Sequence, residues 1–104
     1  MSEADKLFEK IGYKKIEHNI NIKPGDFIPQ DEPYIMYEDE KEINGTYYTM
    51  FIIFHITSKL VEIGGSERGK TPYGKDYFRI RNPILNIKEI KAISMKVREL
   101  KWQN

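Results

Sequence analysis

Apolar residues near the start of the chain recur with the spacing of an amphipathic helix. Leu7, Phe8 and Ile11 fall on one helical face. Ser2 precedes them, and its hydroxyl is placed to accept a hydrogen bond from a backbone amide of the first turn. The pattern predicts a short helix over 2–11.

A longer amphipathic pattern closes the chain. Asn86 and Glu89 stand three residues apart, the spacing of a capping box at the start of a helix. Apolar residues then follow at intervals of three and four: Ile90, Ile93, Val97 and Leu100. This pattern predicts a C-terminal helix with one face packed on a sheet.

The middle of the chain carries strand patterns instead. Asn44 and Gly45 separate two strand-like runs, and both residues tolerate the positive φ angles of a type I′ hairpin turn. The acidic run 38–42 leaves a wider loop open as an alternative, and with it the register. Residues 50–54 are all apolar, as in a central strand covered on both faces. Prolines argue against regular structure over 19–33.

Two further strands are expected after the hairpin. Residues 58–63 are expected to pair back on the preceding strand, and 76–82 alternate between the two faces up to Pro83. The order of helix, antiparallel strands and helix is typical of an α+β domain. The sequence predicts one domain over 1–104, with an antiparallel sheet of about four strands packed against an N-terminal and a C-terminal helix.

Composition narrows the classes of function. The 104 residues include no cysteine, which excludes disulfides, thiolate metal sites and a cysteine nucleophile. The start is charged rather than apolar, and no run reaches the ~20 apolar residues of a membrane span. We therefore expect a cytoplasmic protein without membrane contact. Charge is asymmetric: residues 1–58 carry a net −5 and residues 59–104 a net +6. Such a charge asymmetry is expected where the two halves of the chain face each other, in the fold or in a dimer, or where the basic half binds an anionic partner.

Residues 64–71 match the phosphate-binding pattern G-x-x-x-x-G-K-[ST]. In nucleotide hydrolases a helix begins at the Lys-Ser/Thr end, so that backbone amides converge on phosphate. Here Gly74 is a poor helix former, and 76–82 have a strand period. We expect a flexible, glycine-rich hairpin tip, and we keep a nucleotide-binding enzyme using Lys70 and Thr71 only as a remote alternative.

The same region supports a second hypothesis. Cations that neutralise phosphates, beside aromatic rings on which bases stack, are the ingredients of single-strand nucleic-acid binding. The residues concerned are Arg68, Lys70, Lys75, Tyr77, Arg79 and Arg81. Lysines and Arg98 of the terminal helix would extend this surface. The alternative is an exposed hairpin with solvated charges, which the near-neutral net charge of +1 favours.

Tyrosines flank the predicted hairpin and provide the leading hypothesis. Tyrosine is enriched at protein interfaces, although it also forms cross-strand pairs within sheets. The predicted contact residues are Tyr34, Tyr37, Tyr47 and Tyr48. His18 and His55 lack a spaced carboxylate partner, so we expect no metal, no cofactor and no catalytic residue. The predicted function is a non-enzymatic interaction domain with a protein partner or a second copy.

The two ends of the chain also carry a resemblance. The segments 4–17 ("ADKLFEKIGYKKIE") and 86–102, with the strand "YIMYE" at 34–38, are similar to small uncharacterised proteins of phages and prophages of low-GC Gram-positive bacteria. Those proteins share a helix ending in a "GYKK"-like turn and a terminal helix. The segments 19–33 and 64–75 depart from that pattern. The resemblance implies a phage-related origin and assigns no catalytic residue.

Overall fold

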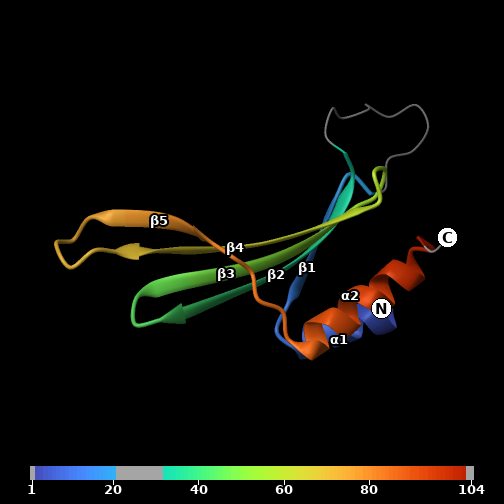
Figure 1. The fold of residues 1–104 in the computed structure, drawn as a ribbon, viewed down its shortest axis with the longest axis horizontal. Helices are drawn as coiled ribbons and strands as arrows, with labels where there is room; N and C mark the ends of the chain where they lie inside the picture. Colours follow the sequence, from blue (N-terminus) through green and yellow to red (C-terminus); the bar gives the residue numbers. More distant parts are fainter. Residues whose placement is uncertain (1, 21–31, 103–104) are drawn as a thin grey trace.

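The computed structural model describes residues 2–20 and 32–102. Its elements follow in the order α1 (Glu3–Lys10), β1 (Lys14–His18), β2 (Tyr34–Ile43), β3 (Thr46–His55), β4 (Leu60–Lys70), β5 (Asp76–Arg81) and α2 (Ile87–Glu99) (Figure 1). The irregular segment predicted over 19–33 falls mostly outside the described residues.

Both predicted helices are present with their caps. The Asp5 amide donates to the Ser2 hydroxyl at 3.0 Å, and Gly12 follows α1 with φ +106°. At α2 the Glu89 amide donates to Asn86 Oδ1 at 2.8 Å, and the Asn86 amide donates back to Glu89 Oε1 at 2.8 Å. The sequence signals therefore place both helix starts correctly, because a cap depends only on neighbouring residues.

The strands form one antiparallel sheet in the order β1-β2-β3-β4-β5, one strand more than the sequence predicted. The turn between β2 and β3 has φ +52° at Asn44 and +82° at Gly45, as expected for a type I′ turn. It fixes the register in which Tyr37 lies opposite Ile52, and the acidic run 38–42 belongs to β2 rather than to a loop.

Both helices cover the same face of this sheet, which we call the helix face. Phe8 of α1 and Ala92 of α2 are buried against Ile35, Tyr37 and Phe54. The rings of Phe8 and Tyr37 stack with centroids 3.9 Å apart, a contact worth about 0.5–1.5 kcal/mol beyond its buried area. The main core thus lies between the two helices and β2–β3.

The fully apolar run 50–54 lies in the central strand, as predicted, but its two faces differ. Ile52 and Phe54 point to the helix face and are buried, whereas Phe51 and Ile53 point to the opposite face and are half-buried. The Phe51 ring lies across Gly64 of β4, where an added Cβ would stand 2.1 Å from Phe51 Cζ. Gly64 is therefore required by a neighbouring ring.

A buried polar network joins the helices to the sheet. Asp5 of α1 accepts hydrogen bonds from Tyr37 Oη, from Lys15 Nζ at 2.8 Å and from Lys96 Nζ at 3.2 Å. Burial by itself would raise the pKa of Asp5, but the bonds from Lys15, Tyr37 and Lys96 together outweigh it and lower that pKa below the ordinary range. In a second link, Tyr13 donates to Glu89, and burial together with this bond raises the pKa of Tyr13.

This network corrects the predicted face of α2. Ile93, Val97 and Leu100 pack on the core, but Ile90 is half exposed. Glu89 and Lys96 are buried instead, because Tyr13 and Asp5 offer them partners. Lys96 is only 4% exposed, so it cannot extend a basic surface as the sequence suggested.

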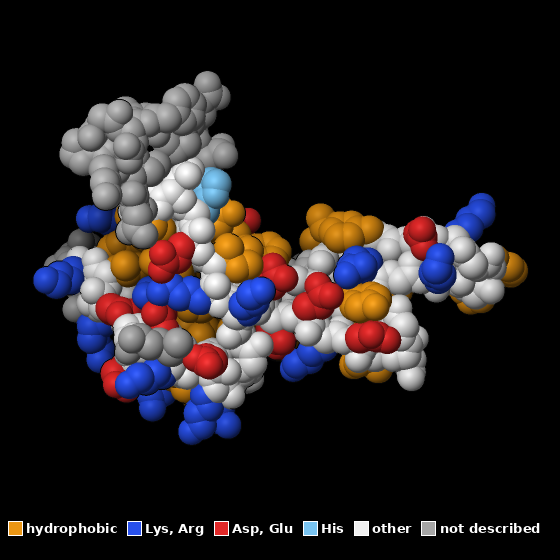
Figure 2. Space-filling view, turned by 180° about the vertical axis from the view of Figure 1, so that it is seen from behind, with side chains coloured by type: hydrophobic (Ala, Val, Ile, Leu, Met, Phe, Trp, Pro, Cys, Tyr) orange, Lys and Arg blue, Asp and Glu red, His pale blue; other side chains and the backbone are white. Residues whose placement is uncertain are grey.

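The molecule is elongated, with extents of 52 × 35 × 23 Å. Its radius of gyration is 16.1 Å, against about 13 Å for a compact domain of this size. The reason is that the paired hairpins extend well past the helices (Figure 1). We call residues 40–49 and 66–81 the arm, and the helices with the rest of the sheet the base. Figure 2 shows the arm as a narrow projection from a thicker base.

Candidate functional site

The arm has no apolar core. Of its residues, all of which the structure describes, Glu67 alone is buried, with 6% of its surface exposed. The buried apolar residues of the described chain all belong to the base. The arm is therefore held together by its strand ladders and by polar contacts, and its apolar side chains remain available to a partner.

Glu67 of β4 organises the helix face of the arm. Its carboxylate accepts a hydrogen bond from Tyr77 Oη at 2.6 Å and one from the Arg81 guanidinium, and Arg79 Nη2 lies 3.9 Å away. The bonds from Tyr77 and Arg81 lower the pKa of Glu67, and the bond to Glu67 raises the pKa of Tyr77. One carboxylate therefore serves two arginines.

The arginines of the arm also cover tyrosine rings. The Arg68 guanidinium lies 4.3 Å from the centre of the Tyr47 ring, and Arg68 Nη2 is 3.3 Å from Glu40 Oε1. Arg81 stands 5.8 Å from the ring centre of Tyr48, and Arg79 stands 5.7 Å from that of Tyr77. These are cation–π distances, so each ring already has a cation near it.

The predicted basic surface is consequently divided. Arg68 and Lys70 project from the face opposite the helices, whereas Arg79 and Arg81 project from the helix face. Lys75 lies in the turn before β5, and Lys70 pairs with Asp76 at 2.8 Å. The arm holds six basic and four acidic residues, a net +2. Charges that are paired locally, and rings that are already covered, weigh against nucleic-acid binding.

The four predicted contact tyrosines do not form one surface. Tyr37 is 1% exposed and sits in the core, so it cannot contact a partner, which corrects its predicted role. Tyr48 lies on the helix face, while Tyr34 and Tyr47 lie on the opposite face. Tyr34 is opposite His55, eight positions along β3 from Tyr47, which is roughly 27 Å. Of the four predicted tyrosines, Tyr47 is therefore the one that lies both in the arm and on its opposite face.

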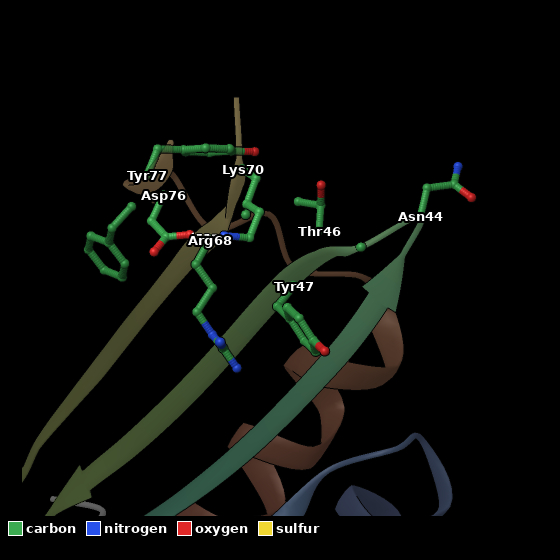
Figure 3. Close-up of a pocket in the computed structure, with 10 residues that line it drawn as sticks. Asn44, Thr46, Tyr47, Arg68, Lys70, Asp76 and Tyr77 are labelled. Atoms are coloured by element: carbon green, nitrogen blue, oxygen red, sulfur yellow. Dashed lines mark hydrogen bonds and ion pairs between the residues drawn. The ribbon is translucent and has the colours of Figure 1, made fainter. Parts of the chain in front are cut away.

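A notch separates the two hairpin ends of the arm. The β3–β4 ladder ends at the pair Tyr47 and Arg68, beyond which the hairpins diverge. The notch has a volume of about 770 Å³. Figure 3 shows Arg68 reaching toward Tyr47, with Lys70 and Asp76 on the β4–β5 hairpin and Asn44 and Thr46 on the β2–β3 hairpin. Its two cationic side chains, Arg68 and Lys70, are paired with Glu40 and Asp76, so neither is free to bind an anion without losing that partner.

The phosphate-loop pattern is not a loop. Residues 64–70 belong to β4, which pairs with β3 on one side and from Gly65 with β5 on the other. After Lys70 the Thr71 amide donates to the Lys75 carbonyl at 2.8 Å, which closes a turn into β5. The predicted turn into an extended strand is confirmed. The predicted hairpin tip is wrong for 64–70, since these residues lie in β4 and those at 65–68 pair with a strand on both sides.

The most exposed apolar residues of the arm's strands are not among the protein-contact residues predicted from the sequence. Phe78 is 67% exposed and Ile80 is 80% exposed. Both lie on the opposite face of β5, and β5 is the edge of the described sheet. Phe78, Arg68 and Tyr47 form one row across β5, β4 and β3. The alternation of 76–82 was the available signal, but it could not show which side would stay uncovered.

Both histidines contact neighbouring side chains of the sheet. The His18 ring stacks on Tyr34 with centroids 4.7 Å apart, and His55 Nε2 lies 2.9 Å from Glu62 Oε1. Among residues 2–20 and 32–102, no group of three His, Cys, Asp or Glu side chains is arranged to hold a metal ion.

Comparison with protein-family models, with curated proteins and with solved structures finds no match to this chain. The resemblance to phage proteins therefore stays a prediction. Within the described residues, neither helix has the length and apolar character needed to cross a bilayer.

Proposed function

We propose that this chain is a non-enzymatic protein-binding domain that docks its partner on the opposite face of the arm. The contact residues are Tyr47 and Arg68 together with Phe78 and Ile80, which we call the arm patch. Tyr47 keeps the contact role expected from the sequence. The partner's identity is open, and a role in phage or host machinery follows only from the sequence resemblance.

The observation that carries the proposal is the exposure of Phe78 and Ile80 on one face of an edge strand. Each Å² of apolar surface removed from water contributes about 25 cal/mol, so a partner that covers these side chains gains from contact with them. Phe78 lies opposite Arg68, which lies opposite Tyr47, and arginine and tyrosine are residue types that dominate binding energy at interfaces. Exposed apolar groups beside such residues are typical of interaction sites.

Nucleic-acid binding through Arg68, Lys70, Lys75, Tyr77, Arg79 and Arg81 remains an untested hypothesis. The guanidinium groups of Arg68 and Arg79 already lie near the Tyr47 and Tyr77 rings on which a base would stack. A phosphate would compete with Glu67 for Arg81 and with Asp76 for Lys70. These costs favour a protein partner over a nucleic acid.

The experiment compares two double variants. Phe78→Ser/Ile80→Ser removes the apolar side chains of β5 from the arm patch. Ile84→Ser/Ile87→Ser removes two similarly exposed apolar side chains, one before α2 and one at its first residue. Each immobilised protein is incubated with lysate of the source organism, and bound proteins are quantified by mass spectrometry. We expect the second variant to retain the same specific protein as the unmodified chain and the first to lose it. Equal retention by all three proteins would contradict the proposal.

A further inference from the structure

The free side of β5 exposes backbone hydrogen-bonding groups as well as side chains. The Thr71 amide bonds the Lys75 carbonyl, and in an antiparallel ladder bonded and non-bonded pairs alternate from there. Tyr77, Arg79 and Arg81 therefore fall at the bonded positions opposite β4. The amides and carbonyls of Phe78 and Ile80 point away from β4, and among the described strands β5 pairs only with β4. In Figure 1, β5 forms the outer margin of the arm.

The two faces of β5 differ in chemistry. Phe78 and Ile80 are on the opposite face, and Arg79 and Arg81 are on the helix face. Arg79 and Arg81 are about half to two-thirds exposed, and they share the single carboxylate of Glu67. A strand laid beside β5 would thus meet apolar side chains on one face and, on the other, two arginines that share one carboxylate and so keep a net positive charge.

We infer that β5 binds an extended segment of the protein partner as a sixth strand, and that this segment alternates apolar with acidic residues. This inference rests on the proposed function and names its mode of binding. Backbone hydrogen bonds to Phe78 and Ile80 supply affinity, as in other cases of strand addition. The apolar residues of the segment cover Phe78 and Ile80, and its carboxylates lie opposite Arg79 and Arg81, where opposite charges across strands attract.

Charge argues against a second copy as the occupant. If two copies paired their β5 strands around a two-fold axis, each helix-face residue of one β5 would lie opposite a helix-face residue of the other. Those residues are Tyr77, Arg79 and Arg81, with Lys75 in the turn before them. Every such register sets Arg79 opposite Tyr77 or opposite a basic residue. None offers a carboxylate, and like charges directly opposite each other destabilise a ladder.

The first experiment selects ligands from random sequences, so it does not require the partner to be identified. A phage-displayed library of random linear peptides is panned on the intact chain, with the Ile80→Pro variant as the counter-target. We expect enriched sequences in which apolar and acidic residues alternate. Enriched sequences that lack this alternation would overturn the inference, and so would a failure to enrich any sequence.

The second experiment separates strand addition from side-chain contact. Amide hydrogen exchange is measured with and without the selected peptide. Exchange at Phe78 and Ile80 is expected to slow at least tenfold, while that of Tyr77, Arg79 and Arg81, already bonded to β4, changes much less. Peptide binding that depends on Phe78 and Ile80 without protection of their amides would overturn strand addition and leave the proposed function standing. Peptide binding that does not depend on the Phe78 and Ile80 side chains would contradict both strand addition and the proposed function.

Two variants at one position isolate the backbone bond. Ile80→Ala and Ile80→Pro both shorten the side chain, but only proline removes the outward amide, and an edge strand tolerates proline there. We expect Ile80→Pro to bind the peptide about tenfold more weakly than Ile80→Ala, the value of one net hydrogen bond near 1.4 kcal/mol. A nitrogen–proton correlation spectrum checks that each variant is folded. Equal affinities would overturn the inference.

Charge reversal tests the predicted composition of the segment. Arg79→Glu places a carboxylate on the ladder, and Lys75→Glu makes the same change of charge in the turn outside it. The acidic peptide is expected to lose about tenfold in affinity for Arg79→Glu and to change much less for Lys75→Glu. Equal losses would show general attraction rather than strand pairing. Sedimentation of the unmodified chain tests whether β5 instead pairs with a second copy. A dimer that Ile80→Pro converts to a monomer would show that a second copy, rather than a partner segment, occupies β5.

Discussion

The base and the arm share the same strands but are stabilised by different interactions. In the base, Phe8, Tyr37 and Phe54 are buried together, and the buried Asp5 is satisfied by Tyr37 and two lysines. In the arm the one buried side chain is Glu67, held by a tyrosine and an arginine. A single sheet thus passes from a packed core to a solvated ribbon.

The difference teaches where this fold can place a binding surface. Apolar side chains of the base are already covered, so changing them reduces the free energy of unfolding. Apolar side chains of the arm contribute little to folding, which leaves them free for contact with a partner. Regions with few buried apolar contacts also open locally at lower free energy than the core. Under the proposed function, the base therefore provides the stability and the arm provides the binding surface.

The largest expected effect compares two phenylalanines. Phe8→Ala should lower the free energy of unfolding by about 3–5 kcal/mol, because it removes a fully buried ring from the core. Phe78→Ala should change it by no more than about 0.5 kcal/mol, because its ring is exposed. Urea denaturation followed by circular dichroism measures both. Similar losses for the two variants would abolish the distinction between base and arm.

Acid should destabilise the base through Asp5. The folded pKa of Asp5 is lowered relative to the unfolded chain, so its contribution is fully present above the unfolded value of about 4 and is lost as the pH falls through the folded pKa. Asp5→Asn should cost roughly 3 kcal/mol at neutral pH, because it removes the buried carboxylate that pairs with Lys96 and leaves that lysine only the more exposed Glu99. Denaturation from pH 6 to pH 2 measures both effects.

The curves for Asp5→Asn and the unmodified chain should converge at low pH, since protonation removes the same charge as the substitution. Glu3→Gln serves as the control, because Glu3 lies in the same helix but is exposed. Its curve should follow that of the unmodified chain. Parallel curves for Asp5→Asn would show that Asp5 titrates normally in the folded state.

A smaller, local effect is expected in the arm. Glu67→Gln keeps the size of the side chain but removes the charge that holds Tyr77, Arg79 and Arg81. Amide exchange should accelerate at Tyr77 and Arg79, with little change at Ile52 in the base. Asp76→Asn, which removes an exposed partner of Lys70, is the matched control. Acceleration across the whole sheet would show that arm and base open as one unit.

The smallest expected effect concerns nucleic acid. Fluorescence anisotropy with a labelled oligothymidine should show no binding at physiological salt, because Lys70 and the three arginines of the arm have carboxylate partners. A general single-strand-binding protein at the same salt provides a positive control for the assay. Binding that weakens steeply with salt and disappears in Arg79→Ala/Arg81→Ala would instead support the basic-aromatic hypothesis.

Local signals in the sequence located the elements. The Ser2 cap, the pair Asn86 and Glu89, and the turn at Asn44 and Gly45 each act over a few residues, so the elements that they bound could be read directly. The turn also set the register of β2 against β3, since two-residue turns leave no freedom in pairing. The sequence likewise predicted a turn and a strand after Thr71, because Gly74 and the alternation of β5 are local features.

Burial could not be read in the same way. Tyr37 and Tyr48 lie on the same face of the sheet, yet Tyr37 is in the core and Tyr48 is in the arm, beyond the main core. Lys96 resembles the other lysines of α2 until Asp5, 91 residues away in the chain, is placed beside it. These differences depend on where the helices end over the sheet, which no short stretch of sequence encodes.

The sequence by itself determined the order of the elements, the starts of both helices and the turns before β3 and β5, because caps, turns and alternation are contacts between near neighbours. The tertiary structure alone decided that the helices cover only part of the sheet. That placement buries Asp5 and Lys96, leaves Glu67 to organise the arm, and exposes Phe78 and Ile80 at an edge. The physical reason is that solvent exposure depends on the packing of the whole chain, whereas the tendency to form a strand or a helix is a property of each segment.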